Sequence, residues 1–196
     1  MLNKTAFEAM RKELEQFDAL REELIKTSRD ILKASKAAIY SLHRNDAKDA
    51  STKLKSAKNA IVAVEKLIKK DPHLATQPAY HEALEEYVEA SCYHGFITDK
   101  KLPTAEDLNV ETEVSLPGLC DLVGELVRAA INASITGNYR RALDIRGFVS
   151  AVYDELLLFD FRNSPLRRKF DSIKYGLEKL EDLILNLSLR EKIKIH

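Results

Sequence analysis

Two short stretches of the sequence place carboxylates at helical spacing. Glu86 and Glu89 are three residues apart, and Asp121 and Glu125 are four apart, so each pair would share one face of a helix. Two helices that each present such a pair could surround a hard divalent cation, and oxygen-only ligands suit Mg²⁺ or Mn²⁺. Such a cation can activate water and neutralise charge during phosphodiester cleavage. The residue types therefore suggest a hydrolytic metal site, with a solvated acidic surface as the competing interpretation.

The helix predicted over 78–99 changes from acidic to apolar along one face. In order, that face carries Glu82, Glu85, Glu86, Glu89, Tyr93, Phe96 and Ile97. Glu89, with Glu86 beside it, would then lie at the edge of a buried region, where an unneutralised carboxylate costs free energy. Glu82 and Glu85 are expected to be surface charges.

The helix predicted over 117–136 is apolar almost all round, as expected for a central helix of a bundle. Its polar residues form one narrow stripe of Asp121, Glu125, Arg128 and Asn132. This stripe could be the exposed strip of the helix, with Glu125 paired to Arg128. It could equally be a polar seam that faces another helix across a cavity. The spacing leaves both interpretations open.

Other chemistries lack their motifs in this sequence. A ferritin-like di-iron site needs Glu-x-x-His, and none of the five histidines has Glu three residues before it. There is no Gly-rich phosphate loop and no Gly-x-Ser-x-Gly elbow. Cys92 and Cys120 form no Cys-x-x-Cys pair, which disfavours a zinc site or a disulfide framework. His81 and His94 are expected to be structural or substrate-facing.

Composition indicates a folded protein with an uneven charge distribution. The 196 residues are 45% hydrophobic and 32% charged with a formal net charge of zero, which fits one domain over 1–196. Residues 1–70 hold 16 Lys and Arg against 10 Asp and Glu, whereas residues 71–125 hold 2 against 12. An acidic middle could hold cations while basic flanks hold phosphates. The sequence shows neither a long apolar run nor an apolar leader, so we expect a cytoplasmic protein with no membrane partner.

The positions of glycine and proline predict long helices. All six Gly and all five Pro lie after residue 71, and no stretch shows strand alternation. The fold class is therefore all-α, with about six to seven long helices expected. Helices are predicted over 4–42, 46–70, 78–99, 117–136, 139–160 and 165–190, with a short capped turn at Thr104–Asp107 in the connection over 100–115.

Several segments together resemble the translin superfamily, and its translin-associated factor X branch more closely than translin itself. They are Ser28-Arg-Asp-Ile31 followed by Leu42-His-Arg44, Glu86-Tyr-Val-Glu-Ala90 followed by Phe96-Ile97, Asp121-Leu-Val-Gly-Glu-Leu126, Gly137 to Tyr139, and Leu166-Arg-Arg-Lys-Phe170. The resemblance covers nearly the whole chain, through the order and spacing of short strings that are not specific alone. Translin has apolar residues where this chain has Glu86, Glu89 and Asp121, and the factor X branch is the catalytic one.

The resemblance implies a Mg²⁺-dependent endoribonuclease that cleaves single-stranded RNA. Glu86, Glu89 and Asp121 would be catalytic, and together with Glu125 they would bind Mg²⁺ or Mn²⁺. The family fold is a long-helix bundle that assembles into a closed octameric shell with inward-facing sites. Because the chain is shorter than the eukaryotic members, it resembles an archaeal-type member that could assemble with itself; a translin-like partner chain is the other possibility.

Four basic side chains are candidates for binding RNA. Lys36, His43 and Arg44 lie on the first predicted helix, where a solvated basic face is an equal possibility. Arg128 would orient a phosphate or hold Glu125. Contacts of this kind give affinity without sequence readout. Two alternatives to the nuclease remain: a non-catalytic, translin-like binder of single-stranded RNA or DNA, and a purely structural helical scaffold.

Overall fold

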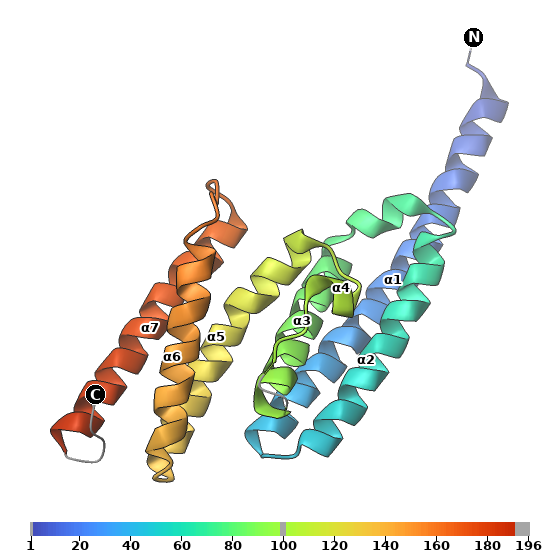
Figure 1. Ribbon diagram of the computed structural model, residues 1–196. Coiled ribbons are helices and arrows are strands. Elements are labelled where there is room, and N and C mark those ends of the chain that lie inside the picture. Colours follow the sequence, from blue (N-terminus) through green and yellow to red (C-terminus); the bar gives the residue numbers. More distant parts are fainter. Residues whose placement is uncertain (1, 99–100, 191–196) are drawn as a thin grey trace. The chain divides into compact units, whose positions relative to one another are not determined.

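The computed structural model describes residues 2–98 and 101–190, and within them every regular element is helical. Seven α-helices and one short 3₁₀ helix follow one another in these residues, which confirms the all-α class (Figure 1). The chain divides into two compact units, Met1–His94 and Gly95–His196. The expectation of one domain over 1–196 stays a prediction.

The first unit is built on a long antiparallel hairpin of α1 (Lys4–His43) and α2 (Ala47–Ile68), which lie side by side in Figure 1. Asn45 turns the chain with a positive φ of 62°, which Asn tolerates better than most residues. Asp46 then caps α2 by accepting a hydrogen bond from the backbone N–H of Asp49 at 2.9 Å. Apolar residues at three- and four-residue spacing bury the facing sides of the two helices; they include Leu24, Ile31, Ala38, Ala57, Ile61 and Val64.

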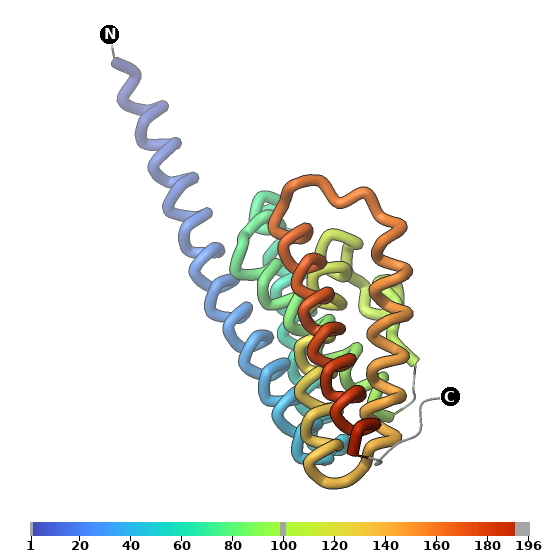
Figure 2. Tube along the Cα trace, turned by 90° about the vertical axis from the view of Figure 1, so that its left-hand side faces the viewer, coloured from blue at the N-terminus to red at the C-terminus, as the bar shows by residue number. Residues whose placement is uncertain are grey.

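The N-terminal part of α1 extends beyond the hairpin, as the blue segment of Figure 2 shows. Between residues 2 and 19, all but two of the residues are exposed, and the first fully buried side chain of the helix is Leu24. The side chain of Asn3 caps this end by accepting a hydrogen bond from the N–H of Ala6 at 3.2 Å. The core of the unit therefore begins about five turns into α1.

A short 3₁₀ helix, η1 (Pro72–Thr76), leads from α2 into α3 (Pro78–Thr98). The imidazole Nε2 of His81 lies 2.8 Å from the carbonyl oxygen of Ala75 and fixes the start of α3. Arg21 of α1 donates to the side chain of Gln77 at 3.0 Å. Of the two roles expected for His81, structural or substrate-facing, this contact fits the structural one. The predicted end of this helix at Asp99 lies outside the described residues.

The second unit contains α4 (Ala105–Leu108), α5 (Thr112–Ile135), α6 (Tyr139–Leu156) and α7 (Pro165–Leu189). The last three pack against one another in pairs. Their core includes Leu122, Leu126, Ile145, Val149, Ile173 and Leu180, all almost fully buried. The expected capped turn is present as α4, where Thr104 and Asp107 form a reciprocal capping box.

Two predicted boundaries are wrong. We expected Pro117 in the first turn of its helix, but α5 begins at Thr112, because the carbonyl of Glu111 already accepts a helical hydrogen bond from Ser115 at 2.9 Å. α6 was expected to continue to residue 160 and ends at Leu156. There, the N–H groups of Leu158 and Phe159 donate to carbonyls three residues back instead of four, which tightens the backbone into a turn.

In the part of the chain that the structure describes, none of the helices combines the length and the apolar character needed to cross a membrane.

Candidate functional site

The first carboxylate pair lies on α3, one turn apart. Glu89 is 8% exposed, and the side chain of Glu86 is 18% exposed. Lys36 of α1 places its Nζ 3.9 Å from Oε2 of Glu86 and is itself half exposed. Tyr93, one turn beyond Glu89, is buried, whereas Glu82 is exposed. The predicted change from an acidic to a buried face therefore holds from Glu82 to Tyr93, with Glu89 on its buried side. Three other residues of this face are half-buried: Phe96, Ile97 and also Glu85.

The second pair lies on α5, between apolar positions that form the core of the second unit. Leu122 and Leu126 are fully buried beside Asp121 and Glu125. Asp121 accepts a hydrogen bond of 2.5 Å from Nζ of Lys169 on α7. The two side chains are 37% and 32% exposed, so the bond is accessible to water from one side.

Arg128 places Nη1 3.9 Å from Oε2 of Glu125, three residues earlier on α5. The pairing that the spacing suggested is therefore present. The Glu125 side chain is only 24% exposed, whereas Arg128 is 53% exposed. Within the stripe on α5, the Glu125 carboxylate is therefore partly buried and the Arg128 guanidinium is exposed to solvent.

The two pairs belong to different units, so their assembly into one metal site stays a prediction. Within the described residues, no three His, Cys, Asp or Glu side chains form a cluster able to hold a metal ion. Each pair alone offers carboxylate oxygens one helical turn apart. This donor set fits a hard cation such as Mg²⁺ or Mn²⁺ and offers nothing to a soft metal.

The basic candidates on α1 have defined surroundings. His43 lies with its ring centroid 5.1 Å from that of Tyr93, and its Nδ1 is 3.3 Å from the tyrosine hydroxyl. Lys36, as described, reaches Glu86. Both side chains therefore connect α1 to the helix that carries the first carboxylate pair.

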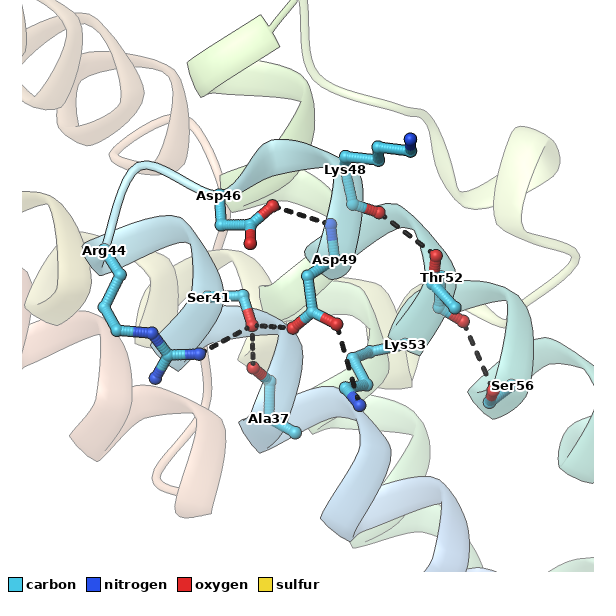
Figure 3. A network of polar contacts seen from close by, with 9 residues as sticks. All are labelled: Ala37, Ser41, Arg44, Asp46, Lys48, Asp49, Thr52, Lys53 and Ser56. Atoms are coloured by element: carbon cyan, nitrogen blue, oxygen red, sulfur yellow. Dashed lines mark hydrogen bonds and ion pairs between the residues drawn. The ribbon is translucent and has the colours of Figure 1, made fainter.

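Arg44 stabilises the turn between α1 and α2, in the polar network of Figure 3. It donates to the hydroxyl of Ser41 at 3.3 Å, and that hydroxyl donates to Asp49 at 2.5 Å. The Ser41 hydrogen bond, helped by the charges of Lys53 and Arg44, lowers the pKa of Asp49 below its usual value. Arg44 is nonetheless exposed, so its guanidinium faces solvent as well as the network.

Lys169 is the residue that sequence reasoning missed. It lies 48 positions from Asp121, and no periodicity within one helix connects them. The signal in the sequence is the basic run Arg167-Arg168-Lys169 in the first turns of α7. Positive side chains are unfavourable near the N-terminus of a helix, so such a run indicates an interaction with an acidic group elsewhere.

The two thiols are buried and free. Burial raises the pKa of Cys92 to about 12, and the nearby charge of Glu89 adds to the effect. Burial also raises the pKa of Cys120 to about 12, with a further contribution from Asp121. Because thiolate is the reactive and metal-binding form, neither cysteine is suited to nucleophilic catalysis at neutral pH.

The structure is that of an all-α protein built from long helices, with carboxylate pairs on α3 and α5. The chain belongs to the Translin family, whose model matches residues 19–191. An uncharacterized protein of Methanocaldococcus jannaschii is 32% identical over 188 residues, which cover 90% of this chain and 82% of that protein. Translin-associated protein X of Mus musculus is 26% identical over 227 residues, covering 94% of this chain and 78% of the mouse protein.

Solved structures of the same family are similar along almost the whole chain. The structure of AfC3PO in complex with duplex RNA has a TM-score of 0.86 at 28% identity and covers 96% of this chain and all of that one. The resemblance inferred from short strings of residues is therefore confirmed at the level of the family.

Proposed function

We propose that this protein is a Mg²⁺- or Mn²⁺-dependent endoribonuclease of the translin-associated factor X type. Its metal ligands are Glu86, Glu89, Asp121 and Glu125. The chain works as a homo-oligomer, with an octameric shell as the expected form, and single-stranded RNA is the expected substrate.

The observation that carries the proposal is the low exposure of Glu89 and Glu86, two of the three side chains inferred to be catalytic. A carboxylate that is 8% exposed, as Glu89 is, loses most of its hydration, and a bound cation would offset part of that cost. Glu86 lies one turn away and is also shielded. A divalent cation would compensate both charges at once.

RNA as the ligand is supported by the relatives. AfC3PO, which is similar over nearly the full length, has been solved in a complex with duplex RNA. Translin-associated protein X aligns with 94% of this chain. Because that complex contains a duplex and our expectation is a single strand, both forms belong in the test.

The side chains have separable tasks in this proposal. When bound, the cation supplies an activated water and neutralises charge on the phosphate. The carboxylates would hold the cation in place of the hydrogen bond that Lys169 donates to Asp121. Lys36 and Arg128, each about half exposed beside a carboxylate, are placed to bind phosphates, as are His43 and Arg44 on α1.

The direct test is cleavage of end-labelled single-stranded RNA and of the matching duplex, in Mg²⁺, in Mn²⁺ and in chelator. Glu89→Gln keeps the volume of the side chain and removes its charge, so we expect the rate to fall at least about a hundredfold. Glu82→Gln is the matched control, because Glu82 lies on the same helix and is exposed. Full cleavage in chelator, or an unchanged rate with Glu89→Gln, would refute the metal-site assignment.

A non-catalytic nucleic-acid binder is the second candidate, and one observation favours it. Glu86, Asp121 and Glu125 each lie beside a basic side chain, as carboxylates in structural ion pairs do. A binder does not need the acidic pairs, so Glu89→Gln should leave RNA affinity unchanged or raise it by removing repulsion. RNA binding without any metal-dependent cleavage would establish this alternative.

A further inference from the structure

The second unit contains a pocket that neither carboxylate pair lines. It has a volume of about 560 Å³ and is lined by residues from the end of α3 and from the first half of α6. The α3 residues, Phe96 and Ile97, belong to this unit, which begins at Gly95. The volume lies within the roughly 300–1,000 Å³ of ordinary small-molecule sites. The pocket is therefore large enough for one nucleotide.

One side of the pocket is apolar and aromatic. The rings of Phe96 and Phe148 lie 4.8 Å apart between centroids and are tilted by 51°. Ile145, which also lines the pocket, is fully buried, whereas both rings are only half-buried. Each ring therefore has an uncovered part on which a flat heteroaromatic group could stack.

The other side is cationic, at a place where cations are otherwise unfavourable. Arg140 and Arg141 occupy the first turn of α6, and this turn contains no acidic residue. The N-terminus of a helix already carries a partial positive charge, and the two arginines add to it, with Asp144 on the next turn paired, among the described residues, to Arg140 alone. The first N–H groups of a helix have no partner within the helix, and Asn138 caps only that of Arg141. An anion would satisfy the others.

Asp144 gives the cationic side a specific geometry. Its carboxylate accepts a 3.1 Å hydrogen bond from Nε of Arg140, so the two terminal guanidinium nitrogens remain available for a bidentate contact with phosphate. The same carboxylate lines the pocket and can accept a hydrogen bond from a base amino group.

We propose that this pocket binds one nucleotide, with its phosphate at Arg140 and Arg141 and its base against Phe96 and Phe148. The inference rests on the proposed function, because RNA is the source of nucleotides expected for this protein. The same chemistry is present in a free nucleoside monophosphate and in an RNA strand that passes over the pocket, and the two sources can be separated by experiment.

The test is a set of calorimetric titrations of the full-length protein with uridine 5′-monophosphate, adenosine 5′-monophosphate, inorganic phosphate and a five-nucleotide RNA. We expect saturable binding of the monophosphates, or of the oligonucleotide alone if the pocket serves a strand. Arg141→Gln and Phe148→Leu should each weaken that binding about tenfold. Arg146→Gln is the matched control, since Arg146 lies on the same helix outside the pocket and pairs with Glu181 at 3.9 Å.

Other results would overturn the inference. If phosphate binds as tightly as the nucleotides and Phe148→Leu has no effect, the site is an anion site only. The pocket is not a nucleotide site if neither the nucleotides nor the oligonucleotide bind, or if Arg141→Gln and Phe148→Leu do not both weaken their binding. Thermal unfolding of each variant separates loss of binding from loss of fold, and Arg141→Gln, which leaves the aromatic pair intact, provides the second, milder variant.

Failure of the inference can be distinguished from failure of the proposed function. Metal-dependent cleavage that Glu89→Gln abolishes, without nucleotide binding at the pocket, refutes this inference alone. Nucleotide binding that depends on Arg141 and Phe148, without cleavage, refutes the nuclease alone.

Discussion

At the scale of single residues, the acidic side chains are distinguished by their neighbours. Asp121 accepts a short hydrogen bond from Lys169, and Glu86 and Glu125 each have a basic side chain at 3.9 Å. These contacts are partly exposed, and ion pairs of this kind contribute at most about 1 kcal/mol. A divalent cation could therefore displace or rearrange them, which makes the pairs compatible with a metal site.

Removing Lys169 should strengthen metal binding if Asp121 is a ligand. Lys169→Met removes the cation that competes for the carboxylate, so we expect the dissociation constant for Mn²⁺ to fall roughly two- to fivefold. Isothermal titration calorimetry measures this directly. Lys174→Met, an exposed position on the same helix, should change nothing. An unchanged affinity in Lys169→Met would indicate that Asp121 does not bind the metal.

Tyr80 should make the stability of the fold depend on pH in alkaline solution. Burial, with the negative charge of Glu65, raises the pKa of Tyr80 from 10.0 to about 12. The unfolded chain then releases this proton more readily than the folded one, so stability is retained below pH 10 and lost as pH rises from 10 towards 12.

Tyr80→Phe removes this contribution. The free energy of unfolding of the variant minus that of the parent should be about 1 kcal/mol more favourable to the variant at pH 11 than at pH 8. Urea unfolding at both pH values measures the change. Tyr175→Phe, at a position that is 64% exposed, should leave the pH dependence as it is. Equal pH profiles for the parent and Tyr80→Phe would contradict the raised pKa.

At the scale of helices, local breakers and tertiary packing compete. Pro117 lies inside α5, where its ring removes one backbone hydrogen bond, yet the helix continues through it. Pro117 and Val114 are both buried, so packing of this turn offsets the lost bond. The preference of proline for the first turn of a helix therefore predicted a start of α5 at Pro117, five residues after its actual start at Thr112.

Two glycines in the middle of helices differ in how closely they are packed, so Gly→Ala at each can distinguish the effect of packing on stability from that of helix propensity. A Cβ on Gly176 of α7 would lie 3.0 Å from Cγ1 of Val123 and 3.4 Å from Cγ2 of Val127, and β-branched side chains cannot easily turn away. A Cβ on Gly147 of α6 meets nothing within 4 Å among the described residues.

We therefore expect opposite effects from the same substitution. Gly176→Ala should destabilise the protein by about 1 kcal/mol, because the α5–α7 contact must open. Gly147→Ala should stabilise it by roughly 0.5–1 kcal/mol through helix propensity. Urea unfolding gives both values. Stabilisation by Gly176→Ala would mean that the two helices do not pack as closely as described.

At the scale of the whole molecule, the surface suggests assembly. Leu157, Leu158 and Phe159, consecutive residues after α6, are 53%, 80% and 49% exposed. Adjacent exposed apolar side chains of this size are typical of interaction surfaces. This agrees with the proposed oligomer.

Native mass spectrometry should find a species of about eight times the 22.2 kDa mass of the chain. Leu158→Glu should shift the population towards smaller species, because a charge would be buried at the interface. Val62→Glu is the control, since Val62 is 43% exposed and lies on α2. A monomer under all conditions would contradict the proposed shell.

Much of the helical structure could be predicted because it depends on residues close in sequence. The burial of Tyr93 and the exposure of Glu82 follow from three- and four-residue spacing, as does the pairing of Glu125 with Arg128. The capping box at Thr104 and the positive φ of Gly137 at the end of α5 follow from residue type. Each of these features requires only one turn of chain.

The carboxylate pairs show what the sequence by itself determined. That Glu86 and Glu89 share one face, and Asp121 and Glu125 another, follows from the geometry of an α-helix. The sequence could not name Lys36 beside Glu86 or Lys169 beside Asp121, which lie 50 and 48 positions away, nor the pocket that Phe96 and Phe148 line. Only tertiary structure decided these contacts, because their partners are set by how helices pack and not by the spacing along any one of them.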